Sequence, residues 1–263
     1  MEDEPLPGGL ANAGQVVRRG EHVVRPAGPD AASVHAFLRA IAATGFDGAP
    51  RPVDLDTEAG RERLTFVDGD VPAVPYPAWS RSDAALASIA RLVRALHDAS
   101  AAFDHRPYRW RDTLADPTGG PIVCHNDVEL GNVVFRDGEA VALIDFEFAA
   151  PGRPTYDLAN LIRLCVPIEH EVDRDRMAWR PADHPSRARL VADAYGLDRI
   201  GRGELAAAID DAIDRVEGAA RRQFDLAEAS AADLLARTGG IEKYDRRRRW
   251  WVQHRPSFAA ALA

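Results

Sequence analysis

The chain has 263 residues, of which 46% are hydrophobic and 28% are charged. This composition is ordinary for a globular protein and excludes a disordered chain, and the length favours two lobes around a cleft. The formal net charge of -8 argues against a nucleic-acid partner. No apolar stretch approaches the roughly 20 residues of a membrane span, and residues 1–5 lack the start of a secretory signal. We therefore expect a cytoplasmic protein without a membrane partner.

The first part of the chain is expected to be rich in β-structure. Two β-branched runs, residues 15–18 and 22–25, flank a glycine-containing turn and predict a hairpin. A helix should follow Asp30, its candidate cap, because apolar residues then recur at helical spacing, and Gly45 marks its expected end. Short strands are expected at residues 53–55 and 64–67.

Prolines at positions 72, 75 and 77 predict a stiff, non-helical connection. We place the boundary between the lobes here. Residues 1–71 form a small β-rich N-lobe, and residues 72–263 form a larger C-lobe.

The C-lobe is predicted to be mainly helical. Apolar residues recur at helical spacing in five segments, at about residues 82–96, 156–164, 185–195, 203–237 and 241–263. Three short apolar runs lie between the first two helices, at residues 122–124, 133–135 and 141–144. Asp137-Gly138 separates the last two runs and is a hairpin signal. This order of elements predicts an α+β fold and not alternating βαβ units.

The informative stretch runs from Cys124 to Asn132, and the next apolar run ends in Asp145. Asp127 follows the end of an apolar strand, and the hairpin should bring Asp145 back beside Asp127 and Asn132. Carboxylate and amide oxygens are ligands that suit Mg²⁺. Phosphoryl transfer needs one carboxylate to orient the attacking hydroxyl, and a second carboxylate with an amide to hold the metal.

These residues carry a resemblance to kinases. His125, Asp127 and Asn132 match the spacing of the kinase catalytic loop. Asp145-Phe146-Glu147 resembles the metal-binding Asp-Phe-Gly with its last residue changed. With Asn126 where protein kinases have Arg, the chain is more similar to aminoglycoside phosphotransferases and choline kinases.

Two further segments support this resemblance. Residues 94–99 are similar to the family's helix before the catalytic loop, and residues 156–159 to its Asp-Leu-Ala helix start. The resemblance implies a two-lobed, protein-kinase-like fold. The N-lobe would bind the nucleotide, and the C-lobe would hold the catalytic loop, the metal site and the substrate pocket.

The resemblance also implies residue roles. Asp127 would be the catalytic base or the residue that orients the hydroxyl, and Asn132 and Asp145 would bind Mg²⁺ and, through it, the nucleotide. His125 would support the loop, and Asp157 would brace it by hydrogen bonds to its backbone. The loop over the nucleotide would contain Gly8, Gly9 and Asn12.

Two positions depart from the family pattern. Arg25 stands where the family has a strand Lys that reaches the nucleotide phosphates, and His35 stands near the position of its partner Glu. Arginine stays charged and can grip phosphate with two donors, so we expect Arg25 to bind the nucleotide. Histidine cannot replace a carboxylate, so we expect the nucleotide itself to orient Arg25.

The leading hypothesis is an ATP- or GTP-dependent transfer of phosphate to a hydroxyl of an aminoglycoside-like compound, an amino alcohol or a sugar. Arg25 and His35 motivate an alternative, a binding or immunity protein on a degenerate kinase scaffold. Transfer of another part of the nucleotide is a third hypothesis, because a fold alone does not fix the reaction.

Three other features have structural interpretations. Cys124 and Cys165 lie in apolar runs and are expected to be buried free thiols. The run Arg246–Arg249 before two tryptophans is expected to be a solvated helix face with aromatic packing, and not a nucleic-acid site. An acidic cluster is expected to be a charged loop, with attraction of a cationic substrate as its alternative; it comprises Glu169, Glu171, Asp173 and Asp175.

Overall fold

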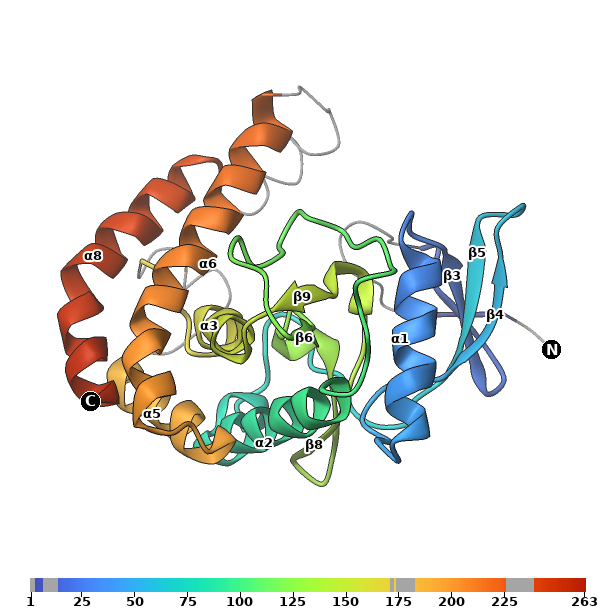
Figure 1. Ribbon diagram of the computed structural model, residues 1–263, viewed down its shortest axis with the longest axis horizontal. Helices are drawn as coiled ribbons and strands as arrows, with labels where there is room; N and C mark the ends of the chain where they lie inside the picture. Colours follow the sequence, from blue (N-terminus) through green and yellow to red (C-terminus); the bar gives the residue numbers. More distant parts are fainter. Residues whose placement is uncertain (1–2, 7–13, 171–172, 174–182, 226–238) are drawn as a thin grey trace.

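The computed structural model describes residues 3–6, 14–170, 173, 183–225 and 239–263. Figure 1 shows a β-sheet with one helix against it at one end of the molecule, and a group of helices at the other. Short strand pairs and the long helix α2 lie between these two parts. The arrangement is α+β, as the order of predicted elements indicated.

The N-terminal sheet is antiparallel, with strand order β1-β2-β3-β5-β4. Its strands are β1 (Glu4–Pro5), β2 (Val17–Arg19), β3 (His22–Pro26), β4 (Pro52–Asp56) and β5 (Arg61–Thr65). The predicted hairpin is confirmed by β2 and β3, which turn at Gly20 with a φ of 63°. The strand β5 begins earlier than the predicted residues 64–67, because its start alternates between exposed arginines and the buried Glu62.

The helix α1 (Ala31–Ala43) lies against this sheet and buries one side (Figure 1). Asp30 precedes it as expected, but its side chain makes no capping hydrogen bond. Gly45 follows the helix with a φ of 90°, a conformation that favours glycine. Phe37 is fully buried and packs on Phe146, with ring centroids 6.3 Å apart. This contact joins α1 to the segment that follows Asp145.

The helix α2 (Asp83–Ser100) begins at Ser82, whose hydroxyl accepts a hydrogen bond from Ala85 N. Two strand pairs follow: β6 (Ile122–Cys124) with β9 (Ala150–Gly152), and β7 (Val133–Arg136) with β8 (Glu139–Leu143). Asp137 and Gly138 turn the second pair with φ values of 51° and 81°. Both have the positive φ of the turns that suit short hairpins.

The region between the two ends of the molecule contains the predicted lobe boundary. Asp70 and Phe135 exchange two backbone hydrogen bonds of 2.8 Å, so the chain before Pro72 is already attached to β7. The division into residues 1–71 and 72–263 stays a prediction.

The helices that follow are α3 (Pro154–Cys165), α5 (His184–Tyr195), α6 (Arg199–Asp225) and α8 (Glu242–Leu262). Within the part of the chain that the structure describes, none is both long and apolar enough to cross a bilayer. The last part of the predicted helix 203–237 lies outside the described residues. Cys124 and Cys165 are buried and free, as expected.

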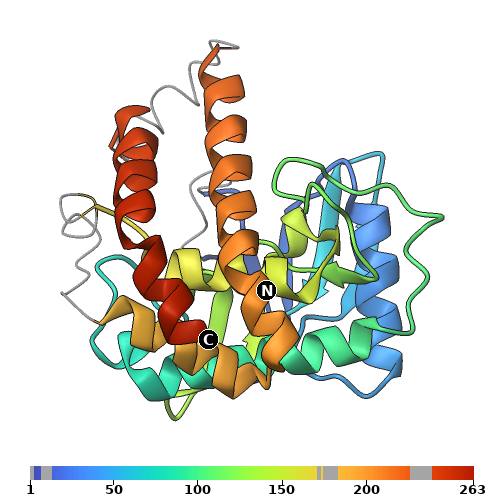
Figure 2. The same cartoon turned by 60° about the vertical axis from the view of Figure 1, so that its left-hand side comes forward.

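Figure 2 shows α6 and α8 standing side by side. The arginine-rich run of α8 connects them, since Arg248 pairs with Asp214 and Glu217. Trp250 and Trp251 are buried on the same helix. The run is therefore a partly exposed helix face that carries ion pairs beside buried aromatic residues.

The aromatic contact of α1 gives a test of the fold. Phe37→Ala should lower the free energy of unfolding by about 3–5 kcal/mol, because it leaves a cavity among buried rings. Urea denaturation measures this change. Val252→Ala is a matched control on an exposed position and should change stability by less than about 0.5 kcal/mol.

Candidate active site

The loop after β6 and the hairpin β7–β8 gather the predicted site residues. Asn132 donates from Nδ2 to the carbonyl oxygen of Asp127 at 2.9 Å and to its Oδ2 at 3.0 Å. The backbone N–H of Ile144 donates to the carbonyl oxygen of Asn132 at 2.9 Å. Asp145 therefore follows a residue that is fixed to Asn132. The amide oxygen of Asn132 makes no hydrogen bond within the described part of the chain.

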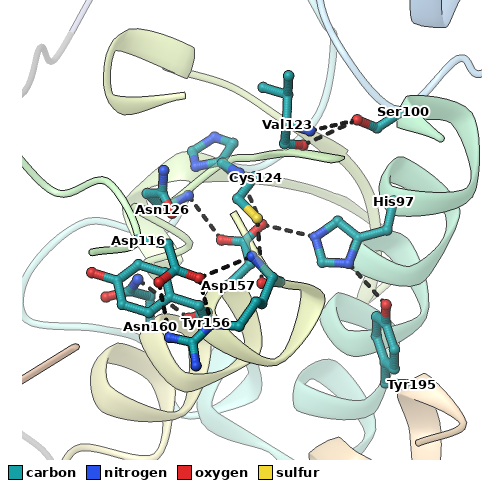
Figure 3. A network of polar contacts seen from close by, with 12 residues as sticks. His97, Ser100, Asp116, Val123, Cys124, Asn126, Tyr156, Asp157, Asn160 and Tyr195 are labelled. Carbon is teal, nitrogen blue, oxygen red and sulfur yellow. Dashed lines mark hydrogen bonds and ion pairs between the residues drawn. The ribbon is translucent and has the colours of Figure 1, made fainter. Parts of the chain in front are cut away.

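Asp157, in the first turn of α3, holds the backbone of this loop (Figure 3). Its carboxylate accepts the backbone N–H groups of His125 and Asn126, both at 2.8 Å. Asn126 needs this support because its φ is 66°, an uncommon conformation for a residue with a side chain. The expected brace by Asp157 is confirmed.

A buried chain of polar contacts fixes Asp157 in turn (Figure 3). His97 of α2 donates from Nε2 to Asp157 at 2.9 Å, and its Nδ1 lies 2.9 Å from the hydroxyl of Tyr195 on α5. Burial opposes the charge of Asp157, but the hydrogen bond and the charge of His97 outweigh it and lower the pKa of this carboxyl. Asp157 is therefore ionised, and three elements converge on the loop.

His125 is buried beneath the loop. Its Nε2 donates to the carbonyl oxygen of Ile144 at 2.9 Å, and its Nδ1 accepts the backbone N–H of Asp127 at 3.3 Å. Burial lowers the pKa of His125, so the neutral ring makes both bonds. The expected supporting position of His125 is confirmed: it joins the loop to the end of β8.

The surroundings of Asp127 raise its proton affinity. Burial raises the pKa of Asp127 to about 7, and the charges of Glu129, Asp145 and Glu147 act in the same direction. Arg163 opposes this shift. The sequence interpretation did not single out Glu129, which lies two positions after Asp127 and whose carboxylate makes no hydrogen bond within the described part of the chain.

Arg25 reaches from β3 toward the same site. Its Nη1 donates to Oδ1 of Asp145 at 2.6 Å, and its Nε donates to Oε1 of Glu62 at 2.7 Å. Glu62 Oε2 accepts from Nε2 of His35 at 2.7 Å. The expectation that the nucleotide itself orients Arg25 is therefore wrong. The carboxylate of Glu62 already holds Arg25, and it comes from β5 and not from α1.

Sequence reasoning missed Glu62, although a signal was present. In the segment Arg61-Glu62-Arg63-Leu64, Glu62 shares its strand face with a leucine that is buried. A charged residue on the apolar face of a strand requires a partner. Glu62 lies directly opposite Arg25 in the register of β3 and β5.

A cavity of about 470 Å³ lies beside Arg25, between the first turn of α1 and the segment after Asp145. Its charged lining residues are Arg25, Asp30, Glu62, Arg111 and Glu147. Arg111 and Glu147 form an ion pair of 3.3 Å across its wall. Burial and the charge of Asp145 raise the pKa of Glu147.

The remaining predicted residues are only partly placed. Gly8, Gly9 and Asn12, expected over the nucleotide, lie outside the described residues. In the acidic cluster, Glu169 pairs with Arg247, and Asp173 with Arg246 at 2.7 Å. Glu171 and Asp175 lie outside the described residues. The two described carboxylates are thus already matched by arginines, in agreement with the structural interpretation.

The family model described as "Phosphotransferase enzyme family" matches residues 101–191, which contain the loop, the hairpin and α3. A trifolitoxin immunity protein from Rhizobium leguminosarum bv. trifolii is 33% identical over 254 residues, covering 94% of this chain and 95% of that protein. The chain belongs to the phosphotransferase enzyme family.

Solved structures agree on the fold. A choline/ethanolamine kinase family protein from Mesorhizobium loti is similar with a TM-score of 0.68 and 18% identity, covering 100% of this chain and 92% of that one. An ADP-bound aminoglycoside phosphotransferase is similar with a TM-score of 0.53 and 14% identity, covering 93% of this chain and 94% of that one. An amicoumacin kinase is similar with a TM-score of 0.55 and 13% identity, covering 86% of this chain and 83% of that one. The expected kinase-like fold is confirmed.

The brace of the loop gives a second test. Asp157→Asn places an amide N–H₂ group against donors whose hydrogen bonds the native carboxylate accepts. The substitution should therefore lower the free energy of unfolding by about 3 kcal/mol. Asp98→Asn is an exposed control and should change stability by less than about 0.5 kcal/mol.

The effect of Asp157→Asn should also depend on pH. Because folding lowers the pKa of Asp157, its contribution is complete above the unfolded pKa and is lost as pH falls through the folded pKa. Denaturation curves should show a constant difference from the native chain above about pH 5 and a shrinking one below about pH 4. A difference that persists undiminished in acid would contradict the charged state of Asp157.

Proposed function

We propose that this protein transfers the γ-phosphate of ATP or GTP to a hydroxyl of a small molecule, such as an aminoglycoside-like compound, an amino alcohol or a sugar. The observation that carries the proposal is the gathering of Asp127, Asn132 and Asp145 at the end of one hairpin, on a loop that Asp157 braces. Membership of the phosphotransferase family supports it.

Asn132 and Asp145 are suited to hold Mg²⁺. The amide oxygen of Asn132 has no hydrogen-bond partner among the described residues, and the Asp145 side chain is 30% exposed. Both offer the hard oxygen ligands that this cation prefers. Bound there, the metal would neutralise negative charge on the phosphates.

Asp127 is suited to act on the acceptor hydroxyl. Its raised pKa lets it accept a proton near neutral pH, and its bond from Asn132 fixes its direction. Arg25 would grip the nucleotide phosphates. The nucleotide-binding roles of Gly9 and Asn12, and of residues 1–71 as a lobe, remain part of this proposal.

The same proposal places the protein in the cytoplasm and pairs it with no nucleic acid. ATP and GTP are cytoplasmic substrates, and the chain keeps two buried, free thiols. Its acidic net charge of -8 also fits a small-molecule acceptor better than a polyanion.

Immunity is a second candidate function, favoured by the identity of 33% to a trifolitoxin immunity protein. Immunity by binding alone requires no turnover of nucleotide. Immunity by phosphorylation would use the site described above. Sustained product formation separates the two, and the mass of the product distinguishes added phosphate from an added nucleotide.

Nucleotide binding is the first test. Mg²⁺-ATP or Mg²⁺-GTP at millimolar concentration should raise the melting temperature, because a ligand of the folded state stabilises it. The shift should need magnesium and disappear in Asp145→Ala. A shift of equal size in that variant would contradict the proposed metal site.

Turnover is the second test. Asp127→Asn should reduce the rate of nucleotide-dependent phosphorylation by roughly 10²–10⁴-fold, with nucleotide affinity largely kept. Mass spectrometry of products from an acceptor panel measures it. Asp137→Asn, an exposed carboxylate in the turn of the same hairpin, is the matched control and should retain full activity. Full activity in Asp127→Asn would contradict the proposed role of Asp127 toward the acceptor hydroxyl.

A further inference from the structure

The guanidinium of Arg25 is divided between two carboxylates. Its Nε lies 2.7 Å from Glu62 and its Nη1 lies 2.6 Å from Asp145. The side chain of Arg25 is only 13% exposed, so water competes little for these donors. Asp145 is the proposed metal ligand, and one of its two oxygens therefore already contacts a cation.

The second carboxylate is fixed from both sides. Glu62 is 4% exposed, and while Oε1 accepts from Arg25, Oε2 accepts from Nε2 of His35, which is 1% exposed. A carboxylate only accepts hydrogen bonds, so Nε2 of His35 must carry the proton. The other ring nitrogen, Nδ1, is buried and has no hydrogen-bond partner among the described residues, so the bond to Glu62 is the one that accounts for the position of this ring.

Glu62 stays charged in this setting. Burial acts against its charge, but His35 and Arg25 outweigh burial and lower its pKa. Asp145 is more exposed, at 30%, and its carboxylate makes no hydrogen bond beyond the one to Arg25 among the described residues. The bond to Glu62 is therefore the anchored one, and the bond to Asp145 is the one that can be exchanged.

We propose that Glu62, fixed by His35, positions Arg25, and that the Nη1 side of Arg25 passes from Asp145 to the phosphates when the magnesium nucleotide binds. This rests on the proposed function. Glu62 keeps its hold on Nε in both states. Glu62 and His35 are thus positioning residues that replace the carboxylate expected on α1.

The exchange couples the metal to the nucleotide. A magnesium ion sits about 2.1 Å from a ligand oxygen, so at Asp145 it would stand beside the guanidinium and repel it. Phosphates draw the guanidinium away and add ligands for the metal. Each ligand therefore increases the affinity for the other, as linkage requires.

Titration with Mn²⁺, alone and with ATP, followed by electron paramagnetic resonance, tests this proposal on the full chain. Arg25→Met removes the cation and keeps much of the side-chain bulk. It should bind Mn²⁺ alone more tightly than the native chain, by roughly tenfold, and bind Mn²⁺-ATP more weakly. Glu62→Gln should also lower the affinity for Mn²⁺-ATP by roughly tenfold. It should not increase the affinity for Mn²⁺ alone, since Arg25 then has only Asp145 as a carboxylate partner.

These opposite effects separate positioning from simple loss of structure, because a poorly folded variant loses affinity for both probes. His35→Gln keeps a donor toward Glu62 and should retain more Mn²⁺-ATP affinity than His35→Leu. The exposed pair Arg91 and Glu139, 3.0 Å apart, provides matched controls as Arg91→Met and Glu139→Gln, which should behave as the native chain.

The proposal is overturned if Glu62→Gln binds Mn²⁺-ATP as the native chain does, or if Arg25→Met leaves the affinity for Mn²⁺ alone unchanged. Asp145→Ala identifies failure of the proposed function instead. Metal binding that survives in that variant, with and without ATP, would mean that Asp145 is not a metal ligand.

Discussion

The site depends on one buried carboxylate. Asp157 accepts two consecutive backbone N–H groups of the loop that carries Asp127, and it is itself held by His97. An ionised carboxylate without water is costly unless donors surround it, so this position leaves little freedom to the loop. The positive φ of Asn126, which turns the chain between His125 and Asp127, persists because these bonds fix it.

The two ends of the molecule meet at this loop through unlike contacts. Phe37 of α1 packs on Phe146, and Arg25 of β3 pairs with Asp145, so consecutive residues of one short segment receive an apolar and a charged contact from the sheet side. The apolar contact needs no ligand. The charged one joins groups that a nucleotide and a metal would also attract, so it is the more adjustable of the two.

Local patterns in the sequence predicted much of the fold and of the loop. The fixed spacing from His125 to Asn132 and the Asp-Gly turn were enough to predict that Asp145 lies near Asn132, because a hairpin brings its two ends together whatever surrounds it. The position of Glu62 on the apolar face of a strand indicated that it needs a partner, but local patterns could not identify Arg25 as that partner, because the register of β3 and β5 pairs residues far apart in the sequence. The pairing of Glu169 with Arg247 likewise joins residues far apart in the chain.

The helix α8 is attached in two different ways along its length. The ion pairs of Arg246, Arg247 and Arg248 hold its first half. In its second half Arg255 pairs with Asp210, but Trp251, Phe258 and Leu262 also pack there in the apolar core. Dissolved salt screens exposed charges but leaves apolar packing in place. The junction of α6 with the start of α8 should therefore loosen as ionic strength rises while the end of α8 stays docked, which makes this arm of the molecule sensitive to the salt content of its surroundings.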